Sequence, residues 1–189
     1  MTDDWHRGDW MQTFTGRKFY PRDPFAADVC VEDIAHALSM QCRYAGHCLR
    51  FYSVAEHCVL MARSPALAGE SLEIRLGALM HDAAEAYFVD IVRPVKRYLD
   101  GYLAMEKNAM RAICDQLRVP RWAVAHDLVK SADDRILNDE REQNMAPSPE
   151  RWQGPQERLG VTLKFWTPAQ AEAEFLRSFD ELRPPMPDA

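Results

Sequence analysis

The stretch SLEIRLGALMHDAAEAY, Ser71 to Tyr87, decides the fold. Its apolar residues, dense from Leu76 to Met80, predict a buried helix over residues 71–87. A histidine and an aspartate, His81 and Asp82, follow directly inside this helix. Because a buried polar group without a partner is costly, these two side chains must be paired or must bind a ligand.

The spacing of this segment indicates a metal site. Adjacent helical residues point about 100° apart, so His81 and Asp82 can both reach one metal ion held between helices. Glu85 lies four residues after His81, one turn further along the same face. A carboxylate beside a metal can handle the protons of a bound water, so we predict Glu85 and Asp82 as catalytic residues.

Helical patterns also fill most of the remaining chain. Predicted helices cover residues 31–41, 53–63, 99–117, 120–143 and 167–182, with loops at 43–52, 65–69, 90–95 and 146–160. Ser53 to Glu56 form a capping-box pattern, and Thr167-Pro168 is an N-cap followed by a first-turn proline. Glycines and prolines in residues 5–29 predict an extended arm with a short hairpin. We therefore expect an arm (1–29), one all-α domain (30–182) and a flexible tail (183–189).

Composition limits the classes of partner and compartment. A length of 189 residues fits one domain, and 47% hydrophobic residues predict a packed core. The net charge of −6 argues against a nucleic-acid polymer as the main partner. There is no apolar run of about 18 residues, so we expect no membrane partner. The polar, acidic N-terminus does not resemble a signal peptide.

The five cysteines favour a cytoplasmic protein with reduced thiols, because the count is odd and no Cys-x-x-Cys pair occurs. Cys42, His47 and Cys48 lie close together and could suggest a zinc site. Because the paired spacing of a zinc knuckle is absent, we interpret them as small buried side chains in a polar loop.

Two further residues complete a candidate metal centre. A His-Asp pair alone is weak, because His126-Asp127 is a second one; Lys130 stands where an acid would be needed, so we interpret that pair as structural. His57 lies one turn into a capped helix, and Asp133 lies on another helix before Ile136 and Leu137. Two imidazoles and two carboxylates from three helices suit a divalent metal with open positions for water and substrate.

The pattern His57 … His81-Asp82 … Asp133 resembles that of the HD-domain phosphohydrolases. Asp82-Ala-Ala-Glu85, then Asp90, then Pro94-Val95-Lys96 is similar to the HD 5'-deoxynucleotidases and to the short bacteriophage dATP triphosphohydrolases. The core of the resemblance covers residues 30–142. It implies an HD-type helical bundle with a divalent metal ion (Mn, Co, Mg or Zn), a small nucleotide substrate and a homo-oligomer.

The resemblance also implies residue roles. His57, His81, Asp82 and Asp133 would be the metal ligands. Asp134 competes with Asp133, but the seven-residue step from Asp133 to Glu140 resembles the family better. Arg43, Tyr44, Asp90, Lys96 and Lys130 would bind the substrate: Arg43-Tyr44 matches an Arg-aromatic pair lining the nucleotide pocket, and the lysines would hold phosphate.

We therefore expect hydrolysis of the 5'-phosphoester bond of deoxynucleotides, with deoxy preferred over ribo forms and a lean toward deoxyadenylates. A monophosphate would give nucleoside and phosphate, and a triphosphate would give nucleoside and triphosphate; the same bond breaks in both, so the catalytic residues do not distinguish them. Other readings are an HD phosphoesterase acting on a cyclic nucleotide or an alarmone, an inactive nucleotide-binding module, and a plain helical bundle.

Overall fold

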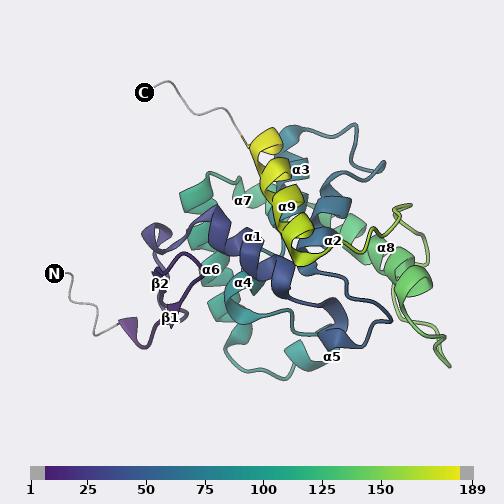
Figure 1. Ribbon diagram of the computed structural model, residues 1–189, viewed down its shortest axis with the longest axis horizontal. Coiled ribbons are helices and arrows are strands. Elements are labelled where there is room, and N and C mark those ends of the chain that lie inside the picture. Colours follow the sequence, from purple (N-terminus) through teal and green to yellow (C-terminus); the bar gives the residue numbers. More distant parts are fainter. Residues whose placement is uncertain (1–6, 184–189) are drawn as a thin grey trace.

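The computed structural model describes residues 7–183, which fold into a mostly helical domain with one small hairpin (Figure 1). The longer helices are α1 (Val31–Met40), α2 (Val54–Ala62), α3 (Leu72–Met80), α6 (Tyr102–Leu117), α8 (Asp127–Asn144) and α9 (Pro168–Leu182). Short helices are α4 (Glu85–Phe88), α5 (Arg93–Lys96), α7 (Arg121–Val124) and the 3-10 turns η2 (Ala26–Asp28) and η3 (Arg43–Gly46). The expectation of a mostly helical domain is confirmed.

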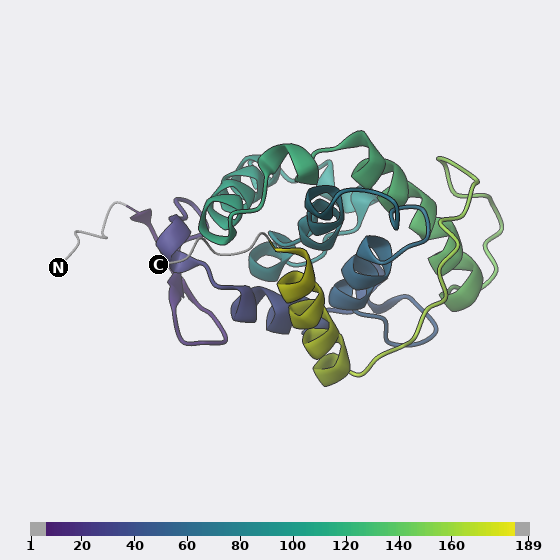
Figure 2. The same ribbon diagram turned by 90° about the horizontal axis from the view of Figure 1, so that it is seen from above.

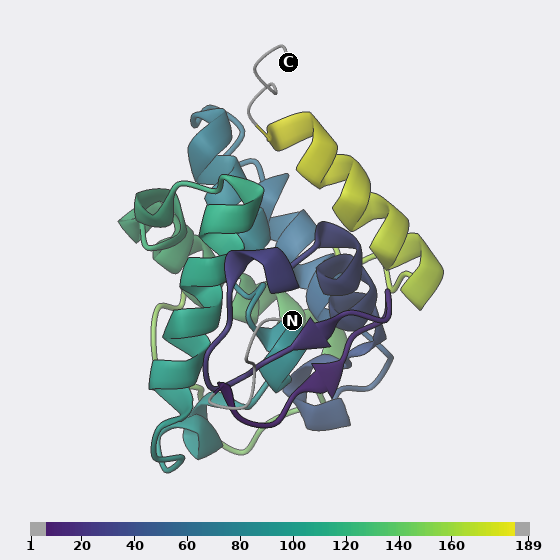
Figure 3. The same cartoon turned by 90° about the vertical axis from the view of Figure 1, so that its left-hand side faces the viewer.

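The core lies where α1, α2, α3 and α9 pack together. Helix α9 crosses α1 in Figure 1, and Figure 3 shows it on the outside of this group of helices. Figure 2 shows α6, α7 and α8 along the opposite side of the molecule. The side chain of every α2 residue from Val54 to Ala62 is buried, which makes α2 the central helix. Gly77 is needed on α3 because a Cβ there would lie 2.5 Å from the carbonyl of Ala123.

The predicted helix over 71–87 is wrong in one respect, because α3 ends at Met80 and α4 begins at Glu85. Between them the backbone makes tight turns, in which the amides of Ala83 and Glu85 bond to the carbonyls three residues earlier. The last carbonyls of a helix lack partners within it, and the imidazole of His81 forms a hydrogen bond with one of them, the carbonyl of Ala78. His81 and Asp82 therefore sit at a helix end rather than inside a continuous helix.

The predicted helix over 120–143 is also divided. It consists of α7 and α8, because the His126 side chain accepts a hydrogen bond from the amide of Leu128 and caps α8. Pro120 is the N-cap of α7 rather than its first-turn residue. The structural interpretation of His126-Asp127 is thus supported by a specific contact.

Other boundaries shift little. The loop predicted at 90–95 contains the start of α5, and α6 begins at Tyr102 because Gly101, with φ of 77°, interrupts the chain before it. The caps at Ser53 and Thr167 are confirmed, but at Ser53 only one half of the capping box forms, since the Glu56 side chain turns elsewhere.

The arm forms the expected hairpin, with β1 (Met11–Gln12) antiparallel to β2 (Lys18–Phe19). Asp33 of α1 fastens it, accepting hydrogen bonds from the amide and hydroxyl of Thr15. Residues 146–160 are irregular as predicted. Of the predicted tail, residues 184–189 lie outside the described residues, as do residues 1–6 of the arm. No helix within residues 7–183 is long and apolar enough to cross a membrane.

Candidate metal centre

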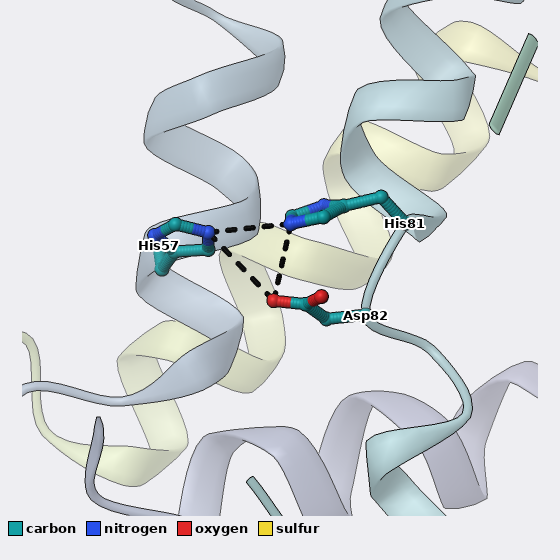
Figure 4. Close-up of side chains that lie close together, drawn as sticks. All are labelled: His57, His81 and Asp82. Atoms are coloured by element: carbon teal, nitrogen blue, oxygen red, sulfur yellow. Dashed lines mark hydrogen bonds and ion pairs between the residues drawn. The ribbon is translucent and has the colours of Figure 1, made fainter. Parts of the chain in front are cut away.

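Three of the four side chains predicted as metal ligands, those of His57, His81 and Asp82, point toward one another (Figure 4). The Nε2 atoms of His57 and His81 lie 3.3 Å apart, and an Asp82 carboxylate oxygen lies 3.1 Å from the His81 Nε2 and 3.7 Å from the His57 Nε2. Asp133 approaches from α8, with Oδ1 3.4 Å from the His57 Nε2 and 3.8 Å from the His81 Nε2. Helices α2 and α8 and the turn that follows α3 thus bring two imidazole nitrogens and two carboxylates close together.

The other nitrogen of each imidazole is held by an acceptor. The Nδ1 of His57 lies 2.6 Å from Glu140 Oε1, and the Nδ1 of His81 lies 2.9 Å from the carbonyl of Ala78. Because a carboxylate and a carbonyl only accept, each Nδ1 carries the proton and donates it. In the neutral rings both Nε2 lone pairs therefore face the centre, which is the tautomer that metal-binding histidines use.

This donor set fits a divalent cation. Two facing Nε2 lone pairs and two carboxylate oxygens repel one another unless positive charge lies among them. Without a metal these charges favour a proton on His81: despite burial, Asp82 and Asp133 raise the pKa of His81 well above its usual value. Burial opposes the ionisation of Asp82 as well, but His81 lowers the pKa of Asp82 to about 2. Mixed nitrogen and oxygen ligands suit Mn, Co or Zn, and Mg less well.

Asp133 and Asp134 differ in what they face. Asp133 turns one oxygen to the histidines and the other to Arg93, whose Nη2 lies 2.6 Å away. Among the residues described, Asp134 forms an ion pair only with the guanidinium of Arg93, at 2.8 Å. The geometry therefore favours Asp133 as the ligand. It also brings Arg93, which was not among the predicted site residues, to the edge of the centre. Its position directly before Pro94 in the motif that resembles the family was the available signal.

Glu85 is buried beside the centre, 6% exposed. Its Oε2 has no hydrogen-bond partner among the described residues, and its Oε1 lies 3.7 Å from the Lys96 ammonium. Burial, together with the charges of Asp82 and Asp90, raises the pKa of Glu85 to about 9. A carboxyl that keeps its proton at neutral pH can donate it to a leaving group.

The Arg43 guanidinium and the Tyr44 hydroxyl both contact acidic residues of the centre. The Arg43 guanidinium is buried and contacts Asp82 at 3.7 Å and Glu140 at 3.4 Å. The Tyr44 hydroxyl donates to Glu140, and its ring lies 5.7 Å from that of Trp152. Their contacts hold the centre together, so a role in binding the nucleotide stays a prediction for both.

The remaining predicted substrate residues, Asp90, Lys96 and Lys130, differ in their contacts. Lys96 bonds to Glu106 at 2.6 Å and faces Glu85, and the backbone amide of Asp90 is held by Gln41. Burial and the charge of Asp82 raise the pKa of Asp90, while Arg43 opposes this. Lys130 is exposed one turn before Asp133 and forms no ion pair with another described residue.

Glu140 is a site residue whose role the sequence did not reveal. It is fully buried and joins His57, Arg43 and Tyr44. Although burial opposes it, Arg43 and His57 lower the pKa of Glu140 to about 2. Its signal was the seven-residue step from Asp133, which places both carboxylates on one face of α8.

Comparison with known proteins identifies relatives of this chain in two bacteria. The uncharacterized protein YfdR of Escherichia coli (strain K12) is 40% identical over 132 residues, which cover 70% of each chain. An uncharacterized protein of Rhodobacter capsulatus is 33% identical over 141 residues, covering 71% of this chain and 72% of the relative. No known family model matches the chain.

Proposed function

We propose that this chain, which belongs to the same family as YfdR of Escherichia coli, is a metal-dependent phosphohydrolase with an HD-type helical bundle. Its substrates would be deoxynucleotides, and the bond cleaved would be the 5'-phosphoester. The observation that carries the proposal is the convergence of His57, His81, Asp82 and Asp133, with a buried, unpartnered carboxyl oxygen of Glu85 beside them.

His57, His81, Asp82 and Asp133 would hold the metal ion. When bound, a divalent cation lowers the pKa of water and polarises a phosphoryl oxygen. The chain itself supplies the fixed geometry: the hydrogen bonds from Nδ1 of His57 and His81 orient both rings before any ligand arrives. Ligands held in this way cost little reorganisation during the reaction.

Glu85 would act on the leaving group. Its raised pKa supports a protonated carboxyl at neutral pH, and the Lys96 ammonium 3.7 Å away can stabilise the carboxylate that remains. In the reaction, the oxygen of water bonds to phosphorus, the bond from phosphorus to the sugar 5'-oxygen breaks, and the Glu85 proton goes to that oxygen. The proton released by the attacking water returns the carboxylate to its starting state.

Positive charge for the phosphate would come from the segment around α5. The Arg93 side chain is 56% exposed although its guanidinium bonds to both Asp133 and Asp134, so an anion can approach it from solvent. Lys96 lies on the same short helix. Together they can neutralise charge as it moves onto the phosphate oxygens. Lys130, exposed on α8, is a further candidate for the distal phosphates of a triphosphate.

The preference for deoxynucleotides rests on the resemblance of the motifs, since the catalytic groups act on the same bond in either sugar series. A closely fitting sugar pocket can reject one hydroxyl by leaving it buried without a partner. The adenine preference has weaker support, because stacking on aromatic rings tolerates every base.

Product analysis tests the proposal. The purified protein, stripped of metal and reloaded in turn with Mn²⁺, Co²⁺, Mg²⁺ or Zn²⁺, is incubated with every dNMP and dNTP and with AMP and ATP. We expect release of nucleoside with phosphate or triphosphate, with dAMP and dATP ahead of AMP and ATP.

Other results of this assay would contradict part or all of the proposed function. Equal rates on ribo and deoxy forms contradict the sugar preference. Turnover only of a cyclic nucleotide or an alarmone, included in the same panel, points to a different phosphoesterase. Metal binding without any turnover points to an inactive binding module. Failure to bind any of the four metals contradicts the proposed function as a whole.

A further inference from the structure

We propose that Cys42 and Cys48 form a reversible disulfide that fastens the loop carrying Arg43 and Tyr44. The two Sγ atoms lie 3.4 Å apart in the reduced protein. Both side chains are half-buried, whereas Cys30, Cys58 and Cys114 are buried. The pair is thus the one place among the described cysteines where two thiols are adjacent and within reach of a small oxidant.

Little movement is needed to form the bond. A disulfide has an S–S distance of about 2.05 Å, so the sulfurs must approach by roughly 1.4 Å. The Cys48 thiol already points toward the base of the loop, 3.8 Å from the carbonyl of Arg43. Rotation of the two side chains can supply most of this approach, because neither sulfur is locked by a strong acceptor.

Both ends of the loop are anchored before oxidation. At one end Cys42 pairs with Ser53 across an isolated bridge, and the amide of Arg43 bonds to the carbonyl of Tyr52. At the other end Asn144 of α8 binds the backbone of Leu49 and Arg50. These anchors hold the two cysteines near each other, which raises the effective concentration of one thiol toward the other.

The loop between the cysteines is strained. Tyr44, Ala45 and Gly46 have φ values of 59°, 50° and 79°, so two side-chain-bearing residues are left-handed in succession. Such conformations cost of order 1 kcal/mol or more each and persist only when the surroundings enforce them. A covalent bond at the base of the loop would oppose its relaxation.

The chemistry is a thiol–disulfide exchange with a small disulfide of the glutathione class. The thiolate of one of the two cysteines attacks the small disulfide and releases one small thiolate. The other cysteine then loses its proton, attacks the mixed disulfide and releases the second small thiolate. In total, two protein thiols and one small disulfide give one protein disulfide and two small thiols.

The bond would act on the metal centre through the loop, and this consequence alone rests on the proposed function. Arg43 touches Asp82 and Glu140, and Tyr44 touches Glu140, so a fastened loop keeps the groups that hold His57 in place. The disulfide itself depends only on the two cysteines.

Peptide mapping tests the bond. The full chain is incubated with oxidised glutathione, its remaining thiols are alkylated in denaturant, and it is cut with trypsin. Arg43 and Arg50 follow the two cysteines, so cleavage separates peptide 23–43 from peptide 44–50 unless a disulfide joins them. We expect the joined pair in the wild type and in Cys114→Ser, and its absence in Cys42→Ser, which retains Cys30 within peptide 23–43.

Thermal unfolding of the same samples tests the fastening. Oxidation should raise the Tm of the wild type by about 5 °C, as expected for closing a short loop, and should leave Cys48→Ser unchanged. Separate peptides after oxidation, or a joined pair that persists in Cys42→Ser, overturn the disulfide. A lower Tm after oxidation overturns the fastening. None of these readouts uses a nucleotide, so a chain without hydrolytic activity can still pass them.

Discussion

Two glutamates, Glu56 and Glu140, are both 0% exposed, yet they serve different regions of the molecule. Glu56 lies on α2 next to His57 and turns toward the segment before α9. There its carboxylate accepts hydrogen bonds from the amides of Lys164, Phe165 and Trp166 at 2.6, 2.9 and 2.7 Å. Glu140 lies on α8 and faces His57, the α2 residue next to Glu56; its carboxylate contacts the side chains of His57, Arg43 and Tyr44.

The partners set opposite electrostatics. Burial raises the pKa of Glu56, and the three neutral amides only partly oppose it. At Glu140 burial acts in the same direction, but Arg43 and His57 overcome it and lower the pKa to about 2. A buried carboxylate satisfied by backbone amides fixes the chain path, whereas one satisfied by a cation and an imidazole tunes those groups. The two sides of α2 are thus a scaffold side and a site side.

The largest effect should come from the centre of the site side. We expect His81→Ala to abolish metal binding and activity together while the protein stays folded, because the ring directs Nε2 at the same point as His57. Elemental analysis and turnover measure the two losses. Asp127→Ala, in the second His-Asp pair, is the matched control and should keep both. Full metal occupancy in His81→Ala would falsify the ligand assignment.

Glu85→Gln should keep the metal and lose turnover by about 10²- to 10⁴-fold, the range for loss of a general acid or base. The amide preserves the shape of the side chain but has no acidic proton to give. Steady-state kcat and metal content are measured in parallel, with Glu73→Gln, exposed on α3, as the control. A kcat within a few-fold of the wild type would make Glu85 a bystander of the site.

Glu140→Gln tests the site half of the comparison. We expect metal affinity to fall by about 10- to 100-fold, as when the carboxylate behind a ligating histidine is lost, with the helical content unchanged. Titration against a metal buffer gives the affinity, and Glu142→Gln, exposed on the same helix, is the control. Unchanged affinity would show that Glu140 serves only the packing of α8.

Glu56→Gln tests the scaffold half. An amide group cannot accept with its nitrogen, so one or more of the three backbone amides loses its partner, and we expect a cost of about 3 kcal/mol in the free energy of unfolding. Metal affinity per folded molecule should stay close to the wild-type value. Denaturant unfolding and metal titration separate the two effects. A metal defect larger than that of Glu140→Gln would reverse the distinction drawn between the two sides of α2.

Asp33 extends the comparison to the arm and should give the smallest effect. Burial raises its pKa, but hydrogen bonds from Thr15 and Cys30 outweigh this, so its pKa lies below the usual value of 3.8. A lowered pKa means that Asp33 stabilises the fold above about pH 4 and loses this contribution as the pH falls further. Asp33→Asn should therefore weaken the acid dependence of stability below pH 4. Identical acid-unfolding curves for variant and wild type would remove Asp33 as an anchor of the hairpin.

Local signals in the sequence were sufficient for the helices and for most of the candidate ligands. The N-caps at Ser53 and Thr167 act within one helical turn. In each, the side-chain hydroxyl oxygen accepts a hydrogen bond from the backbone amide three residues later, so the residue type at the cap is enough to predict it. His57, His81 and Asp82 could be selected because each lies within or directly after a run of apolar residues, where a polar side chain needs a partner. The divided helices could not be foreseen, since the bonds that end α3 and start α8 are made by the imidazoles of His81 and His126.

Only the tertiary structure decided which neighbours meet. Asp133 and Asp134 have the same side chain and only motif spacing favoured the first, whereas the packing of α8 against α2 brings Asp133 to His57 and leaves Asp134 on Arg93. Likewise, the spacing of Arg43 and Glu140 in the chain gives no sign that they touch, 97 residues apart. Sequence periodicity specifies a face of one helix, but a site made of several helices depends on how those faces are packed against each other, which is a property of the whole core.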